Sequence, residues 1–308
     1  MPALDDTNLV REYLSHLGLF TAPDCDRFGY LVDLCRQSGL SAQPVTLARN
    51  RFLMVRSPEA ASLRLEKLFT AHYDRAAGSP GANDNSAAVL ALLFFFRAHY
   101  RAGASMNATL LFTDQEEVPA AASPTGQGTF QLGKRLRATA DTQFVSFHFD
   151  MCGRGDTLII SQAGERLLER RRRSRTALYR NMQTLKTAVM DGLADGYRGR
   201  VLSLPTPFSD NLGFLLQGIP SLQLTMLPAG EAYAYQRKFN QLSEKLSGTT
   251  TASPEEKTHI RRQFREIQPA TWKLRHTADD TVASLEPRSF FLLQNLFSVL
   301  VNRPIPLL

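Results

Sequence analysis

The sequence predicts an α/β protein built as a three-layer αβα sandwich. Short apolar runs rich in Leu, Val and Phe, typical of buried strands, alternate along the chain with amphipathic segments of helical period. Three of these runs end in, or are followed at once by, His, Asp or Glu residues, as at the strand ends of open α/β sheets that carry functional sites. With 308 residues and 43% hydrophobic content, the chain can bury a large core without any low-complexity linker. We therefore expect a single domain over residues 1–308.

The first half of the chain is expected to begin with two helices, followed by strands and then by alternating helices and strands. A capping Asp or Thr in MPALDDTNLVREYL precedes the first amphipathic helix. A helix opening at Asp84 carries Val89, Leu92 and Phe96 on the face that would pack on the sheet. The expected helices lie near 6–19, 25–38, 84–100 and 127–138, and the expected strands near 43–47, 51–55, 65–72, 107–113 and 142–149.

The second half continues the alternation up to residue 229 and resumes with a C-terminal helix. Pro287 suits the first turn of that helix, because the first helical N–H groups need no partner within the helix. The other elements expected here are strands near 157–161, 200–203 and 221–226 and helices near 174–192 and 210–217.

Residues 229–271 lack strand patterns. Their charged, helical sequence predicts a helical hairpin, YAYQRKFNQLSEKL followed by SPEEKTHIRRQFREI. Ser253, with Glu256 three residues later, has the capping-box spacing of a helix start. We interpret the segment as a helical insertion in the domain. Its place before the last candidate ligand suggests a lid or wall over a substrate cleft, and the alternative is a remote surface excursion or an oligomer contact.

The loop AHYDRAAGSPGANDN suggests a metal site. Zinc binds imidazole nitrogen and carboxylate oxygen, and a two-metal hydrolase needs about five such ligands, one of them shared. Gly78 and Gly81 allow the sharp turn that would bring His72 and Asp84 together. Asp74 could accept the second ring N–H of His72 and so fix its tautomer. A solvated loop is the ordinary alternative for such a short pattern.

Three later segments add metal-compatible residues. ATLLFTDQEEV supplies Glu116 and Glu117, FVSFHFDMCG supplies Asp150, and LRHTADDT supplies His276. The first two again follow apolar, strand-like runs, which places their carboxylates at strand ends. His148 shares strand parity with Asp150 and would point to the same face, but a satisfied core histidine is its simpler interpretation.

Five blocks from about Leu65 to Leu308 resemble, in order, those of the zinc-dependent aminopeptidases of the bacterial secreted type, a family that also contains glutaminyl cyclases. The blocks are HYD…GANDN, QEEV, FDM, SDN…GIP and HTADDT. The resemblance implies a zinc-exopeptidase-like fold with a mixed, mostly parallel sheet. It further implies two zinc ions, with His72 and Asp150 on one, Glu117 and His276 on the other, and Asp84 shared.

The resemblance also assigns a catalytic role to Glu116, and the position of Asp74 beside His72 makes Asp74 a second candidate catalytic residue. Glu116 matches the general base, which takes a proton from the attacking water and later gives it to the leaving amine. A carboxylate bound to a cation is held ionised, while an unbound neighbour can exchange a proton near neutral pH, so the pair Glu116 and Glu117 suits this division. Asp74 would orient His72.

The substrate side departs from the family pattern. Arg275 stands where the family often has a tyrosine that polarises the scissile carbonyl; arginine could stabilise an oxyanion there, or it could point away and leave that role empty. The usual S-D-H block reads Ser209, Asp210 and Asn211, so an amide replaces a titratable ring. After Glu117 the loop VPAAASPTGQGTF is longer than the usual glycine turn. We expect Ser209, Asp210, Asn211 and Arg275 to bind substrate.

Three alternative functions are consistent with these residues and with the resemblance. The first is an aminopeptidase that cleaves the N-terminal bond of peptide or aminoacyl substrates with a zinc-activated water. The second is a glutaminyl cyclase, which needs only Asp84, Glu117 and His276 as ligands of one zinc. The third is a non-catalytic binding protein on the same fold, against which the presence of Glu116 beside a full ligand set argues.

Charge and composition limit the partners. The net charge of +7 and the run ERRRRSR, residues 169–175, raise the alternative of nucleic-acid binding, but apart from Tyr179 no aromatic residues interleave with it. We interpret the run as the solvated start of the helix near 174–192 and expect no nucleic-acid partner. The three cysteines, Cys152 among them, are too few and too scattered for a disulfide framework.

The sequence also bears on the compartment. The longest apolar stretch, AAVLALLFFF, is too short to span a bilayer, so we expect no membrane association. No basic segment followed by an apolar one marks the N-terminus as a signal peptide, which predicts a cytoplasmic protein; a processed secreted form would look the same.

Overall fold

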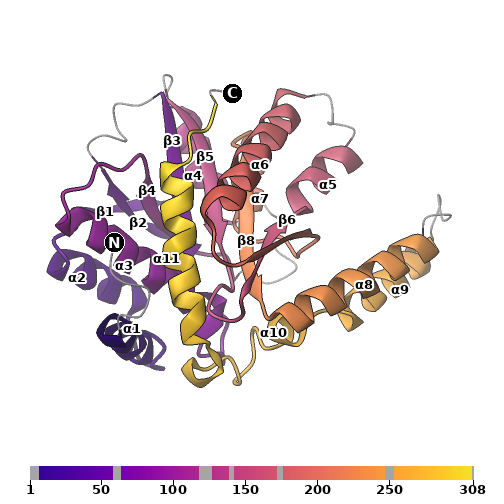
Figure 1. Cartoon of the computed structure of the whole chain (residues 1–308), viewed down its shortest axis with the longest axis horizontal. Coiled ribbons are helices and arrows are strands. Elements are labelled where there is room, and N and C mark those ends of the chain that lie inside the picture. The colour runs from indigo at the N-terminus through magenta and orange to yellow at the C-terminus, as the bar shows by residue number, and fades with distance from the viewer. Residues whose placement is uncertain are drawn as a thin grey trace.

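A computed structural model describes residues 7–57, 64–117, 127–138, 142–171, 176–246 and 253–306 (Figure 1). At its centre lies a sheet in the order β1-β2-β4-β3-β5-β8-β6-β7. The strands are β1 (Ala42–Leu47), β2 (Asn50–Arg56), β3 (Leu65–His72), β4 (Thr109–Thr113), β5 (Gln143–Phe149), β6 (Thr157–Ser161), β7 (Arg200–Leu204) and β8 (Ser221–Leu227).

The sheet is mixed and mostly parallel, as the family resemblance implied. β3 pairs in parallel with both β4 and β5, β5 pairs in parallel with β8, and β6 with β7. The pairs β1–β2, β2–β4 and β6–β8 are antiparallel. Because β4, β3 and β5 are parallel neighbours, their carboxyl ends meet at one edge of the sheet.

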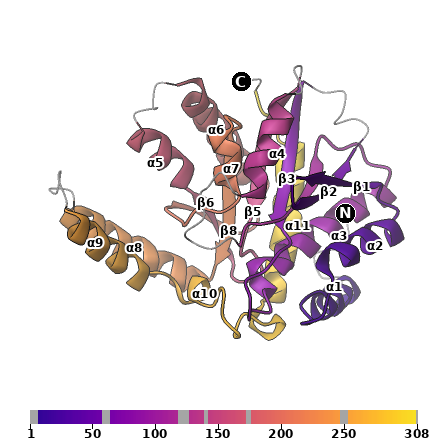
Figure 2. The ribbon, with the colours of Figure 1, turned by 180° about the vertical axis from the view of Figure 1, so that it is seen from behind.

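Helices cover both faces of the sheet, which confirms the sandwich (Figures 1 and 2). Alternation along the strands assigns the faces: Phe69 packs with the helices of one face, while its neighbour Leu68 packs with those of the other. The first face carries α1 (Thr7–Phe20), α2 (Arg27–Gln37), α3 (Ala87–Arg101), α6 (Ala177–Gly196) and α11 (Pro287–Asn302). The second carries α4 (Gly128–Arg137) and α7 (Asn211–Leu216).

The segment after β8 forms the two helices expected from its sequence, α8 (Ala229–Leu246) and α9 (Pro254–Glu266), followed by α10 (Ala270–Lys273). Ser253 and Glu256 make both hydrogen bonds of the capping box. The base of α8 packs through Tyr235 and Phe239 against β6 and β7, together with Trp272 of α10, and the far ends of α8 and α9 extend away from the sheet (Figure 1).

Apart from small shifts of one or two residues at several ends, the structure differs from the expectations in the following places. The regular helix α3 begins at Ala87 rather than Asp84, because Asp84 and Asn85 have non-helical backbone angles within a short π-helical turn (Ala82–Ser86). Helix α5 (Ala163–Arg170) was not expected. The arginine run is therefore not the start of the next helix: it begins at the end of α5, residues 172–175 lie outside the described part of the chain, and α6 starts at Ala177.

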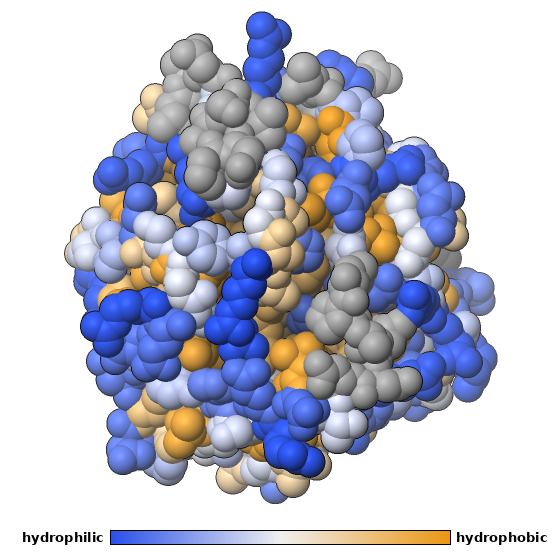
Figure 3. Space-filling model, turned by 60° about the vertical axis from the view of Figure 1, so that its left-hand side comes forward, coloured by the Kyte–Doolittle hydropathy of each residue, from blue (hydrophilic) through white to orange (hydrophobic). Residues whose placement is uncertain are grey.

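Hydrophilic residues predominate on the face shown in Figure 3, with hydrophobic residues in scattered patches between them. Within the described ranges, none of the helices combines the length and apolar character that crossing a bilayer requires. The three cysteines are free thiols, as expected.

Candidate metal centre

One cluster of side chains forms where β3 and β5 end. His72 is the last residue of β3, and Asp150 follows β5 directly. The Nε2 atom of His72 lies 3.2 Å from Oδ1 of Asp84 and 3.7 Å from Oδ1 of Asp150. His72, Asp84 and Asp150 are all buried, and one potential ligand atom from each lies within 4.8 Å of the others.

A second cluster shares Asp84 with the first. The other carboxylate oxygen of Asp84, Oδ2, lies 3.4 Å from Nε2 of His276, which in turn lies 2.8 Å from Oε2 of Glu117. Asp84 thus faces His72 with one oxygen and His276 with the other, the arrangement of a carboxylate shared between two cations. The His276 side chain is 49% exposed, whereas that of His72 is fully buried, so the second cluster is the open side of the centre.

The residues present fit bound cations. Several buried atoms in the cluster have no hydrogen-bond partner among the described residues: both ring nitrogens of His72, Oδ1 of Asp74, Oε1 of Glu117 and Oδ1 of Asp150. Each buried polar atom without a partner costs about 1–3 kcal/mol. A donor set of imidazole nitrogens and carboxylate oxygens is the set that zinc prefers, and coordination would offset this cost.

Glu116 lies beside both clusters, and it groups with His72 and Glu117. Burial raises the pKa of Glu116 well above its ordinary value; the charges of Asp150, Asp210 and Asp84 add to this, while His72 opposes it. For His72, burial disfavours the charged ring, but Asp150, Asp74 and Asp84 outweigh burial and raise its pKa. The surrounding carboxylates therefore favour a positive charge at this position.

Backbone strain is concentrated at this edge of the sheet. Gln115, Met151 and His276 adopt positive φ angles of 62°, 50° and 62°, which side chains other than glycine rarely adopt. Gln115 directly precedes Glu116, Met151 directly follows Asp150, and His276 is itself a candidate ligand. Such strain costs about 1–3 kcal/mol per residue and persists only where the surrounding structure imposes it.

Two further carboxylates hold the candidate ligands in place. Asp74 accepts the backbone N–H of Glu117 at 2.9 Å, and its other oxygen lies 3.5 Å from Nδ1 of His72. Asp280, which the sequence interpretation did not single out, accepts the backbone N–H groups of Asn83 and Asp84 at 2.8 and 3.0 Å. Asp280 lies four residues after His276 in the HTADDT block, which was the available indication of its role.

The block Ser209–Asn211 lies in the interior. Ser209 contacts Nε2 of His148 at 2.9 Å, and Asn211 accepts the backbone N–H of Ser209 at 3.2 Å. Asp210 accepts hydrogen bonds from the hydroxyls of Thr113 and Thr129, and burial raises its pKa to about 7. Burial lowers the pKa of His148 to about 3, so His148 is a neutral ring inside this network.

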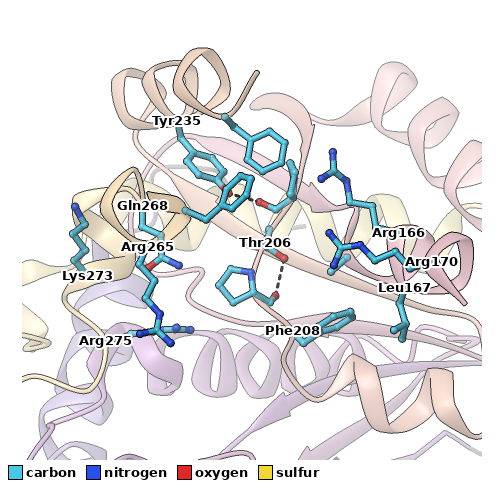
Figure 4. A pocket seen from close by; sticks show the side chains of 15 residues that line it. Arg166, Leu167, Arg170, Thr206, Phe208, Tyr235, Arg265, Gln268, Lys273 and Arg275 are labelled. Carbon is cyan, nitrogen blue, oxygen red and sulfur yellow. Dashed lines mark hydrogen bonds between the residues drawn. The ribbon is translucent and has the colours of Figure 1, made fainter. Parts of the chain in front are cut away.

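A cavity of about 590 Å³ lies between α5, the loop before α7, and the base of α8 and α9 (Figure 4). Arg275, the residue before His276, lines it. Phe208 lines it too, whereas Ser209, Asp210 and Asn211 do not; these three support the loop that carries Phe208. The base of the helical pair therefore forms one wall of this cavity.

The sandwich with its ligand cluster at the carboxyl ends of the central strands defines a protein of the zinc-exopeptidase fold. The chain belongs to peptidase family M28, whose family model matches residues 54–301. The resemblance drawn from the five sequence blocks is thereby confirmed.

Solved structures of the same fold span nearly the whole chain. A Zn-dependent exopeptidase from Parabacteroides distasonis is 17% identical with a TM-score of 0.60, over 98% of this chain and 100% of that one. A glutaminyl cyclase from Bacteroides thetaiotaomicron is 14% identical with a TM-score of 0.61, over 97% and 98%. LapB from Legionella pneumophila is 12% identical with a TM-score of 0.59, over 96% and 71%. No curated protein matches the sequence.

Proposed function

We propose that this protein is a zinc-dependent aminopeptidase that hydrolyses the N-terminal bond of peptides. The observation that carries the proposal is the pair of ligand clusters sharing Asp84, with Glu116 beside them. His72 and Asp150 would hold one zinc ion, Glu117 and His276 the other, and Asp84 both. Bound zinc would supply Lewis-acid polarisation of the substrate carbonyl and a more acidic water.

The protein's own residues supply proton transfer and orientation. Glu116, whose pKa is raised by burial, can take a proton from the attacking water and deliver it to the leaving amine. Asp74 can accept the Nδ1–H of His72 and so direct Nε2 toward Asp84 and Asp150. Arg275, the residue before His276, lines the cavity next to the open side of the centre, so its charge can contact the part of a substrate that extends beyond the metal ions.

A glutaminyl cyclase is the second candidate, and one specific observation favours it. Asp84, Glu117 and His276 form a complete group by themselves, and one zinc ion there could polarise an N-terminal glutaminyl amide for attack by the substrate's own amine. The cluster of His72 and Asp150 has no role as a metal site in that reaction, which is why we place the aminopeptidase first. A non-catalytic binding protein would not need Glu116.

The test is a product analysis of zinc-loaded protein on peptides that differ only in an N-terminal Leu or Gln. An aminopeptidase releases the free amino acid from the Leu peptide. A cyclase leaves the Leu peptide intact and converts the Gln peptide to the pyroglutamyl form with loss of ammonia. Absence of both products at several zinc, cobalt and manganese loadings would contradict both proposals.

A further inference from the structure

The cavity beside the metal centre is lined by basic side chains from separate elements. Arg265 and Arg275 lie together on one side of it, and Arg166 and Arg170 on the opposite side (Figure 4). Lys273 adds a further positive charge. Of the described residues that line the cavity, none is acidic. The cavity therefore concentrates positive charge at one place on a basic protein of net charge +7.

The acidic neighbours of these arginines are engaged elsewhere. On α5, Glu165 pairs with Lys186 on α6 at 2.7 Å, and Glu169 accepts a hydrogen bond from the Tyr179 hydroxyl at 2.9 Å. On α9, Glu266 pairs with Arg262 at 2.9 Å. Within the described residues, no ion pair to a carboxylate forms from any of the five basic groups of the cavity; they are Arg166, Arg170, Arg265, Lys273 and Arg275.

Aromatic side chains form part of the remaining wall, and one of them contacts an arginine of the cavity. Phe208, Phe239 and Phe264 line the cavity, and the guanidinium of Arg166 lies over the Phe239 ring at 4.8 Å. Burial and the neighbouring charge of Arg170 lower the pKa of Arg166, and the charges of Glu169 and Glu165 oppose this only in part. A ligand with an aliphatic stem and a carboxylate end would meet both surfaces.

Two chain segments connect the cavity to the metal centre. Arg275 faces the cavity, and the next residue, His276, is the exposed candidate ligand. Phe208 lines the cavity, and the next residue, Ser209, contacts His148, whose ring stacks with that of His72 at a centroid distance of 6.3 Å. A peptide held at the open side of the centre would therefore extend toward the cavity.

We propose that this cavity is a substrate subsite for carboxylates, which makes peptides that carry a carboxylate close to their N-terminal residue the preferred substrates. The inference rests on the proposed peptidase function. The carboxylate is either an Asp or Glu side chain or the free C-terminus of a short peptide, since both present the same planar anion to an arginine.

The experiment compares kcat/KM of the zinc-loaded protein on four dipeptide substrates. They are Leu-Glu and Leu-Gln, each with a free C-terminus and with a C-terminal amide. A preference for Glu over Gln of about tenfold or more is expected if the side chain is bound, because charge-assisted hydrogen bonds are about twice as strong as neutral ones. A similar preference for the free C-terminus over the amide identifies the C-terminal carboxylate instead. Equal values for all four substrates would overturn the subsite.

Variants can show whether the preference comes from the cavity arginines or from the overall positive charge of the protein. The double variant Arg166→Gln, Arg265→Gln removes one charge from each side of the cavity and should abolish most of the preference through KM. Arg262→Gln, on the same helix as Arg265 but paired with Glu266 outside the cavity, is the matched control and should keep the preference. Loss of the preference in the control alone, or in neither, would contradict the assignment.

A binding measurement keeps the subsite distinguishable from the proposed activity. Calorimetry with Leu-Glu-Glu and Leu-Gln-Gln on zinc-loaded Glu116→Gln protein needs no turnover. Tighter binding of the acidic peptide, without hydrolysis of any peptide by the unmodified protein, would retain the subsite and reject the peptidase. Hydrolysis of all peptides with equal affinities would retain the peptidase and reject the subsite.

Discussion

The metal centre and the basic cavity are neighbouring regions that carry opposite charge. At the centre, carboxylates crowd around buried His72, and their unpartnered oxygens favour a cation. In the cavity, arginines gather around an apolar surface and favour an anion. Arg275 and His276 are adjacent in the chain but belong to the two different regions. A substrate that spans both needs a group that meets metal ions at one end and a carboxylate at the other.

The two regions also differ in how they are held. The centre depends on strand ends of the sheet and on strained or buried backbone, which keep its geometry tight. The cavity is formed by helix surfaces and a loop, and long arginine side chains line it. Such side chains change conformation more easily than the backbone at the centre. We therefore expect substitutions at the centre to change the chemistry strongly and substitutions in the cavity to change selectivity moderately.

Glu116→Gln should have the largest effect. Loss of the proposed general base should lower kcat by about 10²–10⁴-fold. The bound zinc, measured by elemental analysis, should stay at the unmodified level because Glu116 is not one of the proposed ligands. The control is Asp33→Asn, which removes an exposed carboxylate on α2 that pairs with Arg36. A variant that retains full kcat would show that another residue moves the proton.

Zinc removal should change the pH dependence of stability. In the metal-free protein, burial and the Asp84 charge raise the pKa of Glu117 from 4.5 to about 8. The folded state then binds this proton more tightly than the unfolded chain, so the unfolding free energy falls as pH rises from about 4.5 to about 8. Excess zinc replaces the proton and should add about 4 kcal/mol at a thousandfold over its Kd.

Denaturant titrations with zinc and with a chelator check this expectation at pH 5.5 and pH 8. The difference between the two curves should be larger at pH 8, because fewer ligands are protonated there. An equal difference at both pH values would mean that the cluster does not exchange protons for zinc.

Asp280→Asn should have an intermediate effect. The amide keeps one acceptor oxygen, so one of the backbone N–H groups of Asn83 and Asp84 loses its partner and Asp84 is less firmly placed. Zinc affinity should fall by about 10–100-fold, as for other groups that orient ligands, and kcat at saturating zinc should fall less. A competitive zinc titration measures the affinity. Unchanged affinity would leave Asp280 with a role only in the turn before α3.

Arg275→Tyr should have the smallest effect. It tests whether Arg275, which adjoins both regions, acts in the selectivity of the cavity or in the chemistry of the centre. Removing one of several charges around an open cavity should weaken the preference for acidic peptides by about two- to fivefold, the usual scale of an exposed ion pair. Zinc content should not change. The measurement is the ratio of kcat/KM for Leu-Glu and Leu-Gln. A larger loss in kcat than in this ratio would assign Arg275 to the chemistry instead.

The sequence predicted the centre better than the cavity for a physical reason. His72 and Asp150 follow strands whose apolar pattern is local, so their place at the sheet edge can be inferred from neighbouring residues. His276 follows no strand, and the resemblance of its HTADDT block was needed to include it. The contact of Asp280 with Asp84 joins residues 196 positions apart, and no local pattern reveals such a contact.

The cavity depends on features that carry no periodic pattern. Helix α5 is short, and its N-terminal Gln162 makes no side-chain cap, so the sequence offered no clear helix start there and we expected no element between the strand near 157–161 and the helix near 174–192. The arginines of α5 and α9 line one cavity only because the base of α8 packs against β6 and β7 and places α9 opposite α5. Such long-range packing was not predictable, although both helices of the pair were.

The most direct test of the account is the number of zinc ions bound per chain, measured by native mass spectrometry after saturation and removal of free metal. We predict two ions for the unmodified protein and at most one for Asp84→Asn, because Asp84 faces both clusters. A single ion in the saturated, unmodified protein would contradict the two-metal centre and favour the one-zinc cyclase chemistry.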